Sequence, residues 1–312
     1  MFFKNENISC PAGLAPMAGV TDTAFRTICR RMGAAFTMSE MVSADGLVRK
    51  GEKTIRLMRF IPQERPFGIQ LFGNDPVIMG EASVIAEELN PDFIDLNAGC
   101  PARKVVRRGA GAALMNDLTL LEKILNTMRA AVKLPLSVKI RAGDNPASMK
   151  AVEAARAAEA CGFDAVIVHP RYRTQGFSGK ADWNIIKQVR EAVSITVIGN
   201  GDINSPEDCH KMMKQTGCDL ALIGRGTLGK PWLFAQIAGE ISQPPAALIR
   251  QTVIEHYKLI LADKGEYTGV REMRKHLGWY SKGLPGANEF RRKVMTLEKP
   301  EPVTEEIGRF FL

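Results

Sequence analysis

The segment Phe93-Ile94-Asp95-Leu96-Asn97-Ala98-Gly99-Cys100-Pro101 passes from a short, largely apolar run into a turn. Such a run, followed by Gly and Pro, is typical of a buried strand that ends in a loop. A thiol placed between Gly and Pro is poorly suited to fill a core, and it is well suited to hold a titratable group over a ligand. The segment therefore predicts a strand with a functional group just past its carboxyl end.

The same order of apolar run, turn and helical segment recurs along the chain. Several of the runs are almost continuous in Val, Ile and Leu, as expected for parallel strands that are covered on both faces. The eight runs are Leu14–Met17, Phe36–Ser39, Phe67–Leu71, Phe93–Leu96, Leu136–Ile140, Ala165–Val168, Thr196–Ile198 and Leu220–Ile223. Helical spacing follows five of them, at Pro76–Leu89, Leu118–Val132, Pro146–Cys161, Trp183–Val193 and Ser205–Gln215. This alternation predicts an α/β fold, a (β/α)8 TIM barrel.

The alternation stops at Pro244-Pro245, and later segments such as Ala247–Leu261 and Arg271–Lys282 show only helical spacing. We therefore expect a barrel domain over residues 1–243 and a small all-helical domain over residues 244–312. The second domain interleaves basic residues with aromatic ones: Tyr267, Arg271, Arg274, Lys275, Trp279, Tyr280, Phe290, Arg291, Arg292 and Lys293. This mixture suits an RNA-binding surface, and it equally suits a solvated helix face over a local core.

Composition narrows the class of protein. The 312 residues are 45% hydrophobic and 24% charged, which is ordinary for a globular chain. No run approaches the ~20 apolar residues of a membrane span, and the start Met1–Asn7 lacks the basic-then-apolar order of a signal peptide. We therefore expect a cytoplasmic protein without a membrane partner, and the sequence leaves its oligomeric state open.

Cysteine usage and charge add two further expectations. The six cysteines contain no Cys-x-x-Cys pair, and only four histidines are present, so we expect neither a metal site nor a disulfide framework. The net charge of +8 favours a polyanionic partner such as nucleic acid, although the excess is moderate enough to fit a merely basic protein.

In a barrel of this kind, chemistry is carried by residues at the carboxyl ends of the strands. The first run leads into Pro16-Met17-Ala18, whose small size permits the close approach of a flat ligand, or which simply makes a tight turn. Gln70 ends another run with an amide that can both donate and accept. Lys139 interrupts an apolar strand, where it requires an anion or an electron-rich ring as a partner.

The last three runs lead into residues that suit an anion. His169 and Arg171 follow the sixth run, Asn200-Gly201-Asp202 follows the seventh, and Gly224-Arg225 follows the eighth. Glycine-rich turns after the last two strands match the phosphate cup common to this fold. Since no Gly-x-Gly-x-x-Gly motif follows the first strand, FMN is the planar phosphorylated cofactor that fits best.

These residues resemble the tRNA-dihydrouridine synthases, and within them the bacterial B-type branch. The resemblance covers the whole barrel in family order, and its most specific part is the Asn-x-Gly-Cys-Pro-x-x-Lys-Val core at residues 97–105. The other matching segments are Ala15–Asp22, Ser39–Met41, Gln70–Gly73, Val138–Arg141, His169–Arg171, Asn200–Asp202 and Ile223–Gly226. This chain departs from the family on both sides of Arg171. It has Pro170 and Tyr172 where the family often has Gly and Thr.

The resemblance implies an enzyme that reduces specific uridines of the tRNA D-loop to 5,6-dihydrouridine, with NADPH as reductant. It implies that Cys100 is the proton donor. We further expect the substrate contacts to include Asn97, Arg103, Lys104 and Arg171. It also implies FMN held by Pro16, Met17, Ala18, Gln70, Lys139, His169, Asn200, Gly201, Asp202, Gly224 and Arg225.

Three alternatives remain open at the level of sequence. The target could be ribosomal RNA, the substrate could be a free small molecule, or an RNA-binding protein could retain a vestigial barrel. The role of Arg103 and Lys104 is also open, because cations near Cys100 either favour its thiolate or contact the RNA backbone.

Overall fold

The computed structural model describes residues 9–311. The segment Met1–Asn7, in which we found no signal-peptide pattern, lies outside these residues. Eight parallel strands form the barrel, in spatial order β1-β9-β8-β7-β6-β5-β4-β2. They are β1 (Ala12–Leu14), β2 (Thr37–Met38), β4 (Phe67–Phe72), β5 (Phe93–Ala98), β6 (Leu136–Gly143), β7 (Ala165–Tyr172), β8 (Thr196–Asn200) and β9 (Leu220–Ile223).

Backbone hydrogen bonds between the segments of β1 and β2 close the circle. The Leu14 amide donates to the Phe36 carbonyl at 2.9 Å, and the Ala35 amide donates to the Ala12 carbonyl at 2.8 Å. The predicted TIM barrel is thereby confirmed. The sequence predicts the first strand at Leu14–Met17, whereas β1 ends at Leu14 and Pro16 lies beyond it. The predicted strand begins too late because Gly13 interrupts the apolar pattern. A short additional strand, β3 (Val42–Ser43), pairs with β4 and was not predicted.

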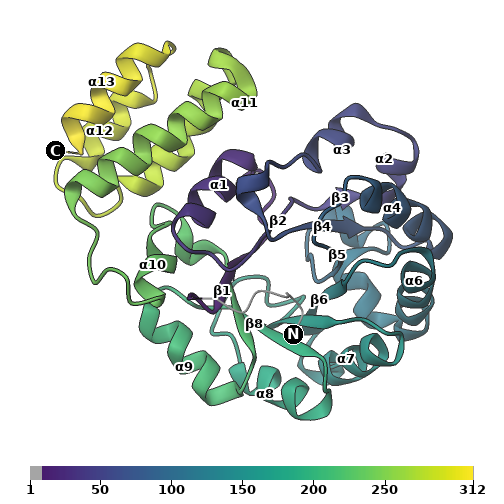
Figure 1. The fold of residues 1–312 in the computed structure, drawn as a ribbon. Coiled ribbons are helices and arrows are strands. Elements are labelled where there is room, and N and C mark those ends of the chain that lie inside the picture. The colour runs from purple at the N-terminus through teal and green to yellow at the C-terminus, as the bar shows by residue number, and fades with distance from the viewer. Residues whose placement is uncertain (1–8, 312) are drawn as a thin grey trace.

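Helices surround the strands, as Figure 1 shows. The outer ring contains α1 (Thr23–Arg31), α4 (Pro76–Glu88), α6 (Leu118–Ala131), α7 (Ala151–Ala160), α8 (Trp183–Ala192), α9 (Pro206–Thr216) and α10 (Leu233–Ile237). Shorter helices lie at α2 (Ala44–Val48), α3 (Glu52–Leu57) and α5 (Arg103–Val106). The helix expected over Pro146–Cys161 is divided, because Met149 is extended and pairs with Gly143 between a 3-10 turn at Pro146–Ser148 and α7.

Two aromatic rings fill the lower part of the barrel. Phe36 and Phe93 meet edge to face, with ring centroids 5.9 Å apart. Each ring lies where a strand has glycine: a Cβ on Gly13 would come within 2.5 Å of Phe36, and one on Gly68 within 2.2 Å of Phe93. Inward side chains thus close the barrel below its carboxyl end, and open space remains at that end.

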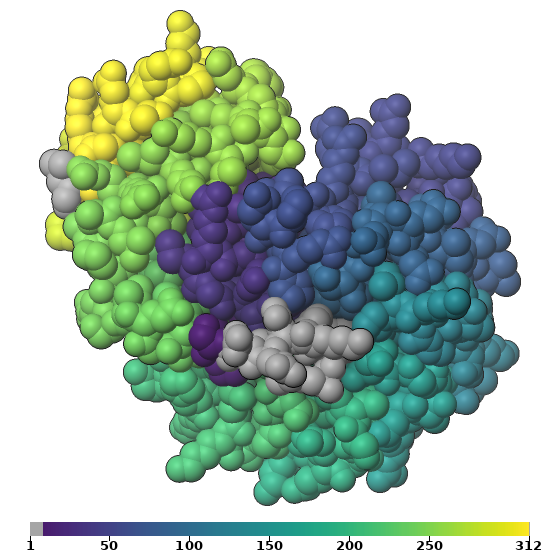
Figure 2. Space-filling view, in the orientation of Figure 1, coloured from purple at the N-terminus to yellow at the C-terminus, as the bar shows by residue number. Residues whose placement is uncertain are grey.

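Three helices follow the barrel: α11 (Ala246–Tyr280), α12 (Ala287–Val294) and α13 (Pro300–Phe310). The two helices expected at Ala247–Leu261 and Arg271–Lys282 form one long element, α11, broken at Gly265 where φ is 74° and ψ is 168°. Figure 2 shows these helices, green to yellow, seated against the purple N-terminal part of the barrel. No helix within residues 9–311 is both long and apolar enough to cross a membrane.

The helical region is joined to α1 by apolar and ionic contacts. Ala24 of α1 belongs to the same buried cluster as Val253 and Tyr257 of α11. Lys264 pairs with Asp22, the residue that caps α1, and Arg31 pairs with Glu255. Of the aromatic residues in this mixture, Tyr280 and Phe290 are buried in this core, as the interpretation of a helix face over a local core expects.

Candidate active site at the carboxyl ends of the strands

A cavity of about 430 Å³ opens at the carboxyl ends of the strands. All eleven residues expected to hold a cofactor line it: Pro16, Met17, Ala18, Gln70, Lys139, His169, Asn200, Gly201, Asp202, Gly224 and Arg225. Asn97, Cys100 and Arg171 line it as well. Arg103 and Lys104 lie outside the lining, exposed on the first turn of α5.

The turns after β8 and β9 meet so closely that only glycine fits between them. A Cβ on Gly226 would come within 2.1 Å of the Ile203 carbonyl oxygen. Gly201 has φ at +127°, which disfavours any side chain. Asn200 Nδ2 ties the two strands together by donating to the Leu222 carbonyl at 2.7 Å. The result is a narrow cradle of backbone with the Arg225 side chain, half exposed, beside it.

Positive charge dominates the walls of the cavity. Burial, together with the charge of the neighbouring Arg141 guanidinium, lowers the pKa of Lys139 to about 8. Burial, together with the surrounding Lys139, Arg141, Arg171 and Arg225 charges, lowers the pKa of His169 to about 2. His169 is therefore a neutral imidazole at physiological pH, and the cavity has a positive potential that favours an anionic ligand.

The cation Arg171 is neutralised within the site. Its Nη2 contacts both carboxylate oxygens of Asp202, at 2.7 and 2.8 Å, and also donates to the Gly179 carbonyl at 2.7 Å. Asp202 accepts from the Ala181 amide as well, at 2.7 Å. The Asp202 carboxylate thus accepts from donors within the protein, and the Arg171–Asp202 pair can hold together the loops that follow β7 and β8.

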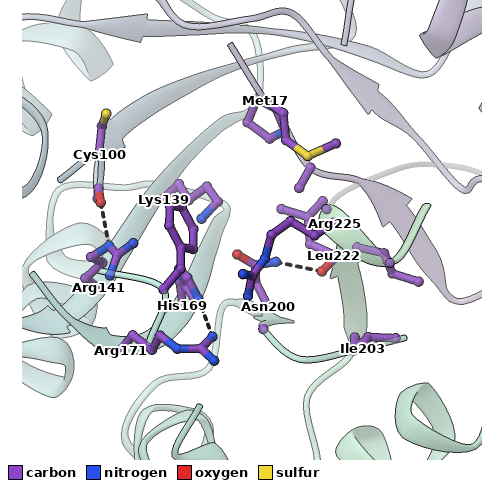
Figure 3. A pocket seen from close by; sticks show the side chains of 18 of the residues that line it. Met17, Cys100, Lys139, Arg141, His169, Arg171, Asn200, Ile203, Leu222 and Arg225 are labelled. Carbon is purple, nitrogen blue, oxygen red and sulfur yellow. Dashed lines mark hydrogen bonds between the residues drawn. The ribbon is translucent and has the colours of Figure 1, made fainter. Parts of the chain in front are cut away.

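The loop that carries Cys100 is held from three sides. The Asn97 Oδ1 accepts the Cys100 amide at 2.9 Å, the Cys100 carbonyl accepts the Ala112 amide at 3.0 Å, and Arg141 Nε donates to the Gly99 carbonyl at 2.8 Å. Figure 3 shows Lys139 between Cys100 and Asn200 in the cavity. The Cys100 thiol is partly exposed, whereas the other five cysteines are buried. Cys100 is therefore the thiol that a ligand can reach.

The sequence reasoning assigned no role to two residues that shape this cavity. Arg141 lies two positions after Lys139 on the same face of β6, and that alternation is a signal that could have identified it. Phe177, by contrast, lies in a loop without periodicity. Its ring is 57% exposed, and the guanidinium carbons of Arg225 and Arg141 lie 4.9 and 5.5 Å from its centroid.

Within residues 9–311, no three His, Cys, Asp or Glu side chains gather in a way that could hold a metal ion.

Comparison with known proteins agrees with this arrangement. The sequence model of the family described as "Dihydrouridine synthase (Dus)" matches residues 13–310. The chain belongs to the dihydrouridine synthase family. The match includes both the barrel and nearly all of the helical C-terminal region, so the resemblance read from residues 97–105 and the other motifs is confirmed, and with it the expectation of an enzyme.

Individual relatives cover almost the whole chain. A protein named tRNA-dihydrouridine synthase B from Pseudomonas aeruginosa is 40% identical over 304 residues, which covers 96% of this chain and 92% of that protein. A probable tRNA-dihydrouridine synthase from Rickettsia conorii is 40% identical over 314 residues, covering 98% of this chain and 95% of that protein. The relationship therefore extends beyond the barrel to the C-terminal helices.

Two solved structures share the barrel fold. They are histamine dehydrogenase from Rhizobium sp. 4-9, with a TM-score of 0.52 and 14% identity, and 6-hydroxypseudooxynicotine amine oxidase from Pseudomonas geniculata N1, with 0.56 and 16%. These matches cover 80% and 77% of this chain. The chain spans about half the length of each, 48% and 49%, and at this identity the likeness shows the fold alone.

Proposed function

We propose that this chain reduces uridines of tRNA to 5,6-dihydrouridine, with FMN bound in the cavity, NADPH as the source of electrons and Cys100 as the proton donor. The observation that carries the proposal is the meeting of a reachable thiol and a glycine-lined anion cradle in one cationic cavity. Family membership supplies the reaction class.

The residues present fit FMN. The glycine cradle at Gly224–Gly226 and the Arg225 charge suit a phosphate, and the Gly201 turn adds a second approach of backbone. The floor offers Gln70 and Lys139, an amide and a cation, to the polar edge of a flat heterocycle. The positive potential that lowers the pKa of His169 also favours a cofactor that carries negative charge.

When bound and reduced, FMN supplies hydride to C6 of the uracil ring. As C6 accepts hydride, negative charge develops at C5 and the C4 oxygen of the base, so an acid must protonate C5. A thiol can donate its S–H proton to a carbon on which negative charge develops. Cys100, fixed by Asn97 at the rim of the cavity, is the group we assign to this step.

The target nucleotide must leave its stack to enter the cavity. We assign the basic residues outside the cavity to contact with the phosphate backbone of the RNA. Arg103 and Lys104 lie on α5, immediately after Cys100, and Arg107 and Arg108 follow at its end. All four are exposed, and none makes an ion pair within the described part of the chain, so their charges are available to phosphates.

We assign a different role to the buried Arg171. Its guanidinium is occupied by Asp202 and by backbone carbonyls, so we assign it to holding the loops around the base rather than to contact with the RNA backbone.

One experiment tests the function. Purified protein is incubated with an unmodified tRNA transcript and NADPH, and dihydrouridine is measured by mass spectrometry. A ribosomal RNA fragment and free uracil derivatives are offered in parallel. The proposal predicts that the protein carries the absorption spectrum of flavin and forms dihydrouridine in tRNA. Product from the ribosomal RNA fragment or a free base, with none from tRNA, would assign one of the alternatives instead.

A further inference from the structure

Three buried polar side chains form a row across neighbouring strands below the cavity. The strand register places Gln70 of β4 beside Asp95 of β5, and Asp95 beside Ser137 of β6. Asn97 lies two positions after Asp95 and therefore projects from the same face of β5, one layer nearer to the cavity. Asp95 and Ser137 are fully buried, so their polar groups have to find partners within the protein.

The partners form a continuous chain that ends at Cys100. Ser137 Oγ donates to Asp95 Oδ1 at 2.6 Å, and Gln70 Nε2 donates to Asp95 Oδ2 at 2.7 Å. Asn97 Nδ2 donates to Gln70 Oε1 at 2.8 Å. The last bond is donated by the Cys100 amide to Asn97 Oδ1, at 2.9 Å. Asp95 is therefore connected to the thiol-bearing loop through two side-chain amides.

Only one direction of the chain allows Asn97 to accept from the Cys100 amide. A backbone N–H can only donate, so Asn97 must turn its oxygen to Cys100 and its nitrogen to Gln70. Gln70 must then accept through Oε1 and donate through Nε2, which requires an acceptor at position 95. A carboxylate satisfies this requirement, and so does a neutral carboxyl group whose proton faces Ser137.

The protonation state of Asp95 does not reverse the chain. Burial raises the pKa of Asp95 to about 7, opposing the hydrogen bonds from Ser137 and Gln70, which lower it. Both forms are therefore accessible near neutral pH, and in both of them the oxygen that faces Gln70 accepts.

We propose that Asp95 is a positioning residue for Cys100: by accepting from Gln70 it sets the direction of the hydrogen-bond chain that holds the Cys100 backbone, and so it fixes the thiol at the rim of the cavity. The importance of this for uridine reduction rests on the proposed function. The link between Asp95 and the reactivity of the thiol does not, because alkylation of Cys100 measures it directly.

The first test compares two substitutions of Asp95. Leu has a similar size but no acceptor, so Asp95→Leu leaves Gln70 and Asn97 without a fixed direction. Asp95→Asn keeps an oxygen for Gln70 and offers its nitrogen to Ser137. We expect Asp95→Leu to raise the rate of Cys100 alkylation by iodoacetamide about threefold or more and to lower kcat for uridine reduction about tenfold. Asp95→Asn should stay within about threefold of wild type in both.

Ser137→Ala is the matched control. It removes a hydrogen bond from the same buried carboxyl group, but Ser137 does not lie between Asp95 and Cys100. A general structural role for Asp95 would make Ser137→Ala and Asp95→Leu alike. The positioning role instead predicts that Ser137→Ala lowers the melting temperature while the alkylation rate and kcat remain within about twofold of wild type.

A reversal experiment tests the direction itself. Asn97→Asp places an acceptor against Gln70, which must turn and point Oε1 at Asp95. Alkylation is measured above pH 7, where Asp95 is ionised and this becomes an unfavourable meeting of two acceptors. Adding Asp95→Asn supplies a donor there and gives a consistent chain of opposite direction. The double variant should therefore recover a rate of Cys100 alkylation close to that of wild type, which Asn97→Asp alone loses.

Several results would overturn the proposal. Folded Asp95→Leu with wild-type alkylation would do so, and so would equal effects of Asp95→Leu and Asp95→Asn, which would indicate charge rather than direction. If Asp95→Leu does not fold, the comparison of Asn97→Asp with the Asn97→Asp/Asp95→Asn double variant decides alone. Additive effects of the two substitutions on the rate of Cys100 alkylation would contradict the hydrogen-bond chain. Alkylation that follows the expectations in a protein that reduces no uridine would sustain the positioning role and reject the proposed function.

Discussion

Arg171 and Asp202 form a two-contact ion pair at the mouth of the barrel, with Arg171 Nη2 at 2.7 and 2.8 Å from the two carboxylate oxygens. Arg171 is buried at the end of β7, and Asp202 follows β8. The pair therefore joins two loops that line the cavity. Removal of Asp202 leaves the buried Arg171 without its neutralising charge, whereas Asp202 also lies 3.7 Å from the Arg225 guanidinium.

Asp202→Asn should consequently lower the free energy of unfolding of the flavin-free protein by about 2 kcal/mol, measured by urea denaturation at neutral pH. Interaction with Arg171 and the Ala181 amide outweighs burial and lowers the pKa of Asp202. Its stabilisation is thus present above the ordinary carboxyl pKa and is lost as the pH falls through the folded-state value. Glu191→Gln is the control, because it breaks an exposed pair with Lys187 at 3.8 Å and should change stability very little. An equal loss of unfolding free energy in Asp202→Asn and Glu191→Gln would contradict a special contribution of the Arg171–Asp202 pair.

The junction between the barrel and the helical region depends on Lys264 and Asp22. Lys264 lies directly before the break at Gly265. The ion pair with Asp22 raises the pKa of Lys264, although partial burial opposes this shift. Lys264→Met should therefore lower the melting temperature by a few degrees, about 1–2 kcal/mol, and weaken tRNA binding in a gel-shift assay. Lys258→Met removes the same charge from an exposed position of α11 and should leave the melting temperature unchanged. A melting temperature that falls equally in both would exclude a specific junction.

Asp95 gives a pH dependence with a defined sign. Because burial raises its pKa from 3.8 to about 7, the folded state binds more protons than the unfolded state between these values. The contribution of Asp95 to stability is therefore complete below the unfolded pKa and is lost as the pH rises towards 7. The free energy of unfolding of wild type, relative to Asp95→Asn, should fall between pH 4 and pH 7. A constant difference across this range would show that Asp95 does not change its ionisation on folding.

Arg103 and Lys104 test the RNA surface. Because both side chains are exposed outside the cavity, we expect each alanine variant to weaken tRNA binding and to reduce the slope of log affinity against log salt by about one. The pH profile of Cys100 alkylation should remain that of wild type. A shifted profile with an unchanged salt slope would instead assign these cations to the tuning of the thiol.

Much of this site could be predicted from the sequence, because parallel strands bring their carboxyl ends to one rim. Gln70, Lys139, Asn200 and Arg225 are far apart in the chain. Lys139 was predicted from its place within an apolar strand and the other three from the ends of their strands, and all of them line the cavity. The boundaries were less certain: Gly13 obscured β1, and the extended Met149 divided the expected helix.

The interactions beneath the cavity could not be predicted, because they depend on register and rotamers. Asp95 looked like one polar residue within an apolar run. Its role became visible only when pairing placed it between Gln70 and Ser137. Likewise, the sequence left Tyr280 and Phe290 open between an RNA surface and a local core, and the packing of α11 to α13 buries both.

The central claim is that Cys100 protonates the base. Cys100→Ala removes the acid without altering the cradle at Gly224–Gly226 or the Lys139 side chain. We predict that the variant retains flavin and tRNA binding and loses most of its uridine reduction when dihydrouridine formation is measured at neutral pH with tRNA and NADPH. Turnover close to wild type in the flavin-loaded variant would contradict the account.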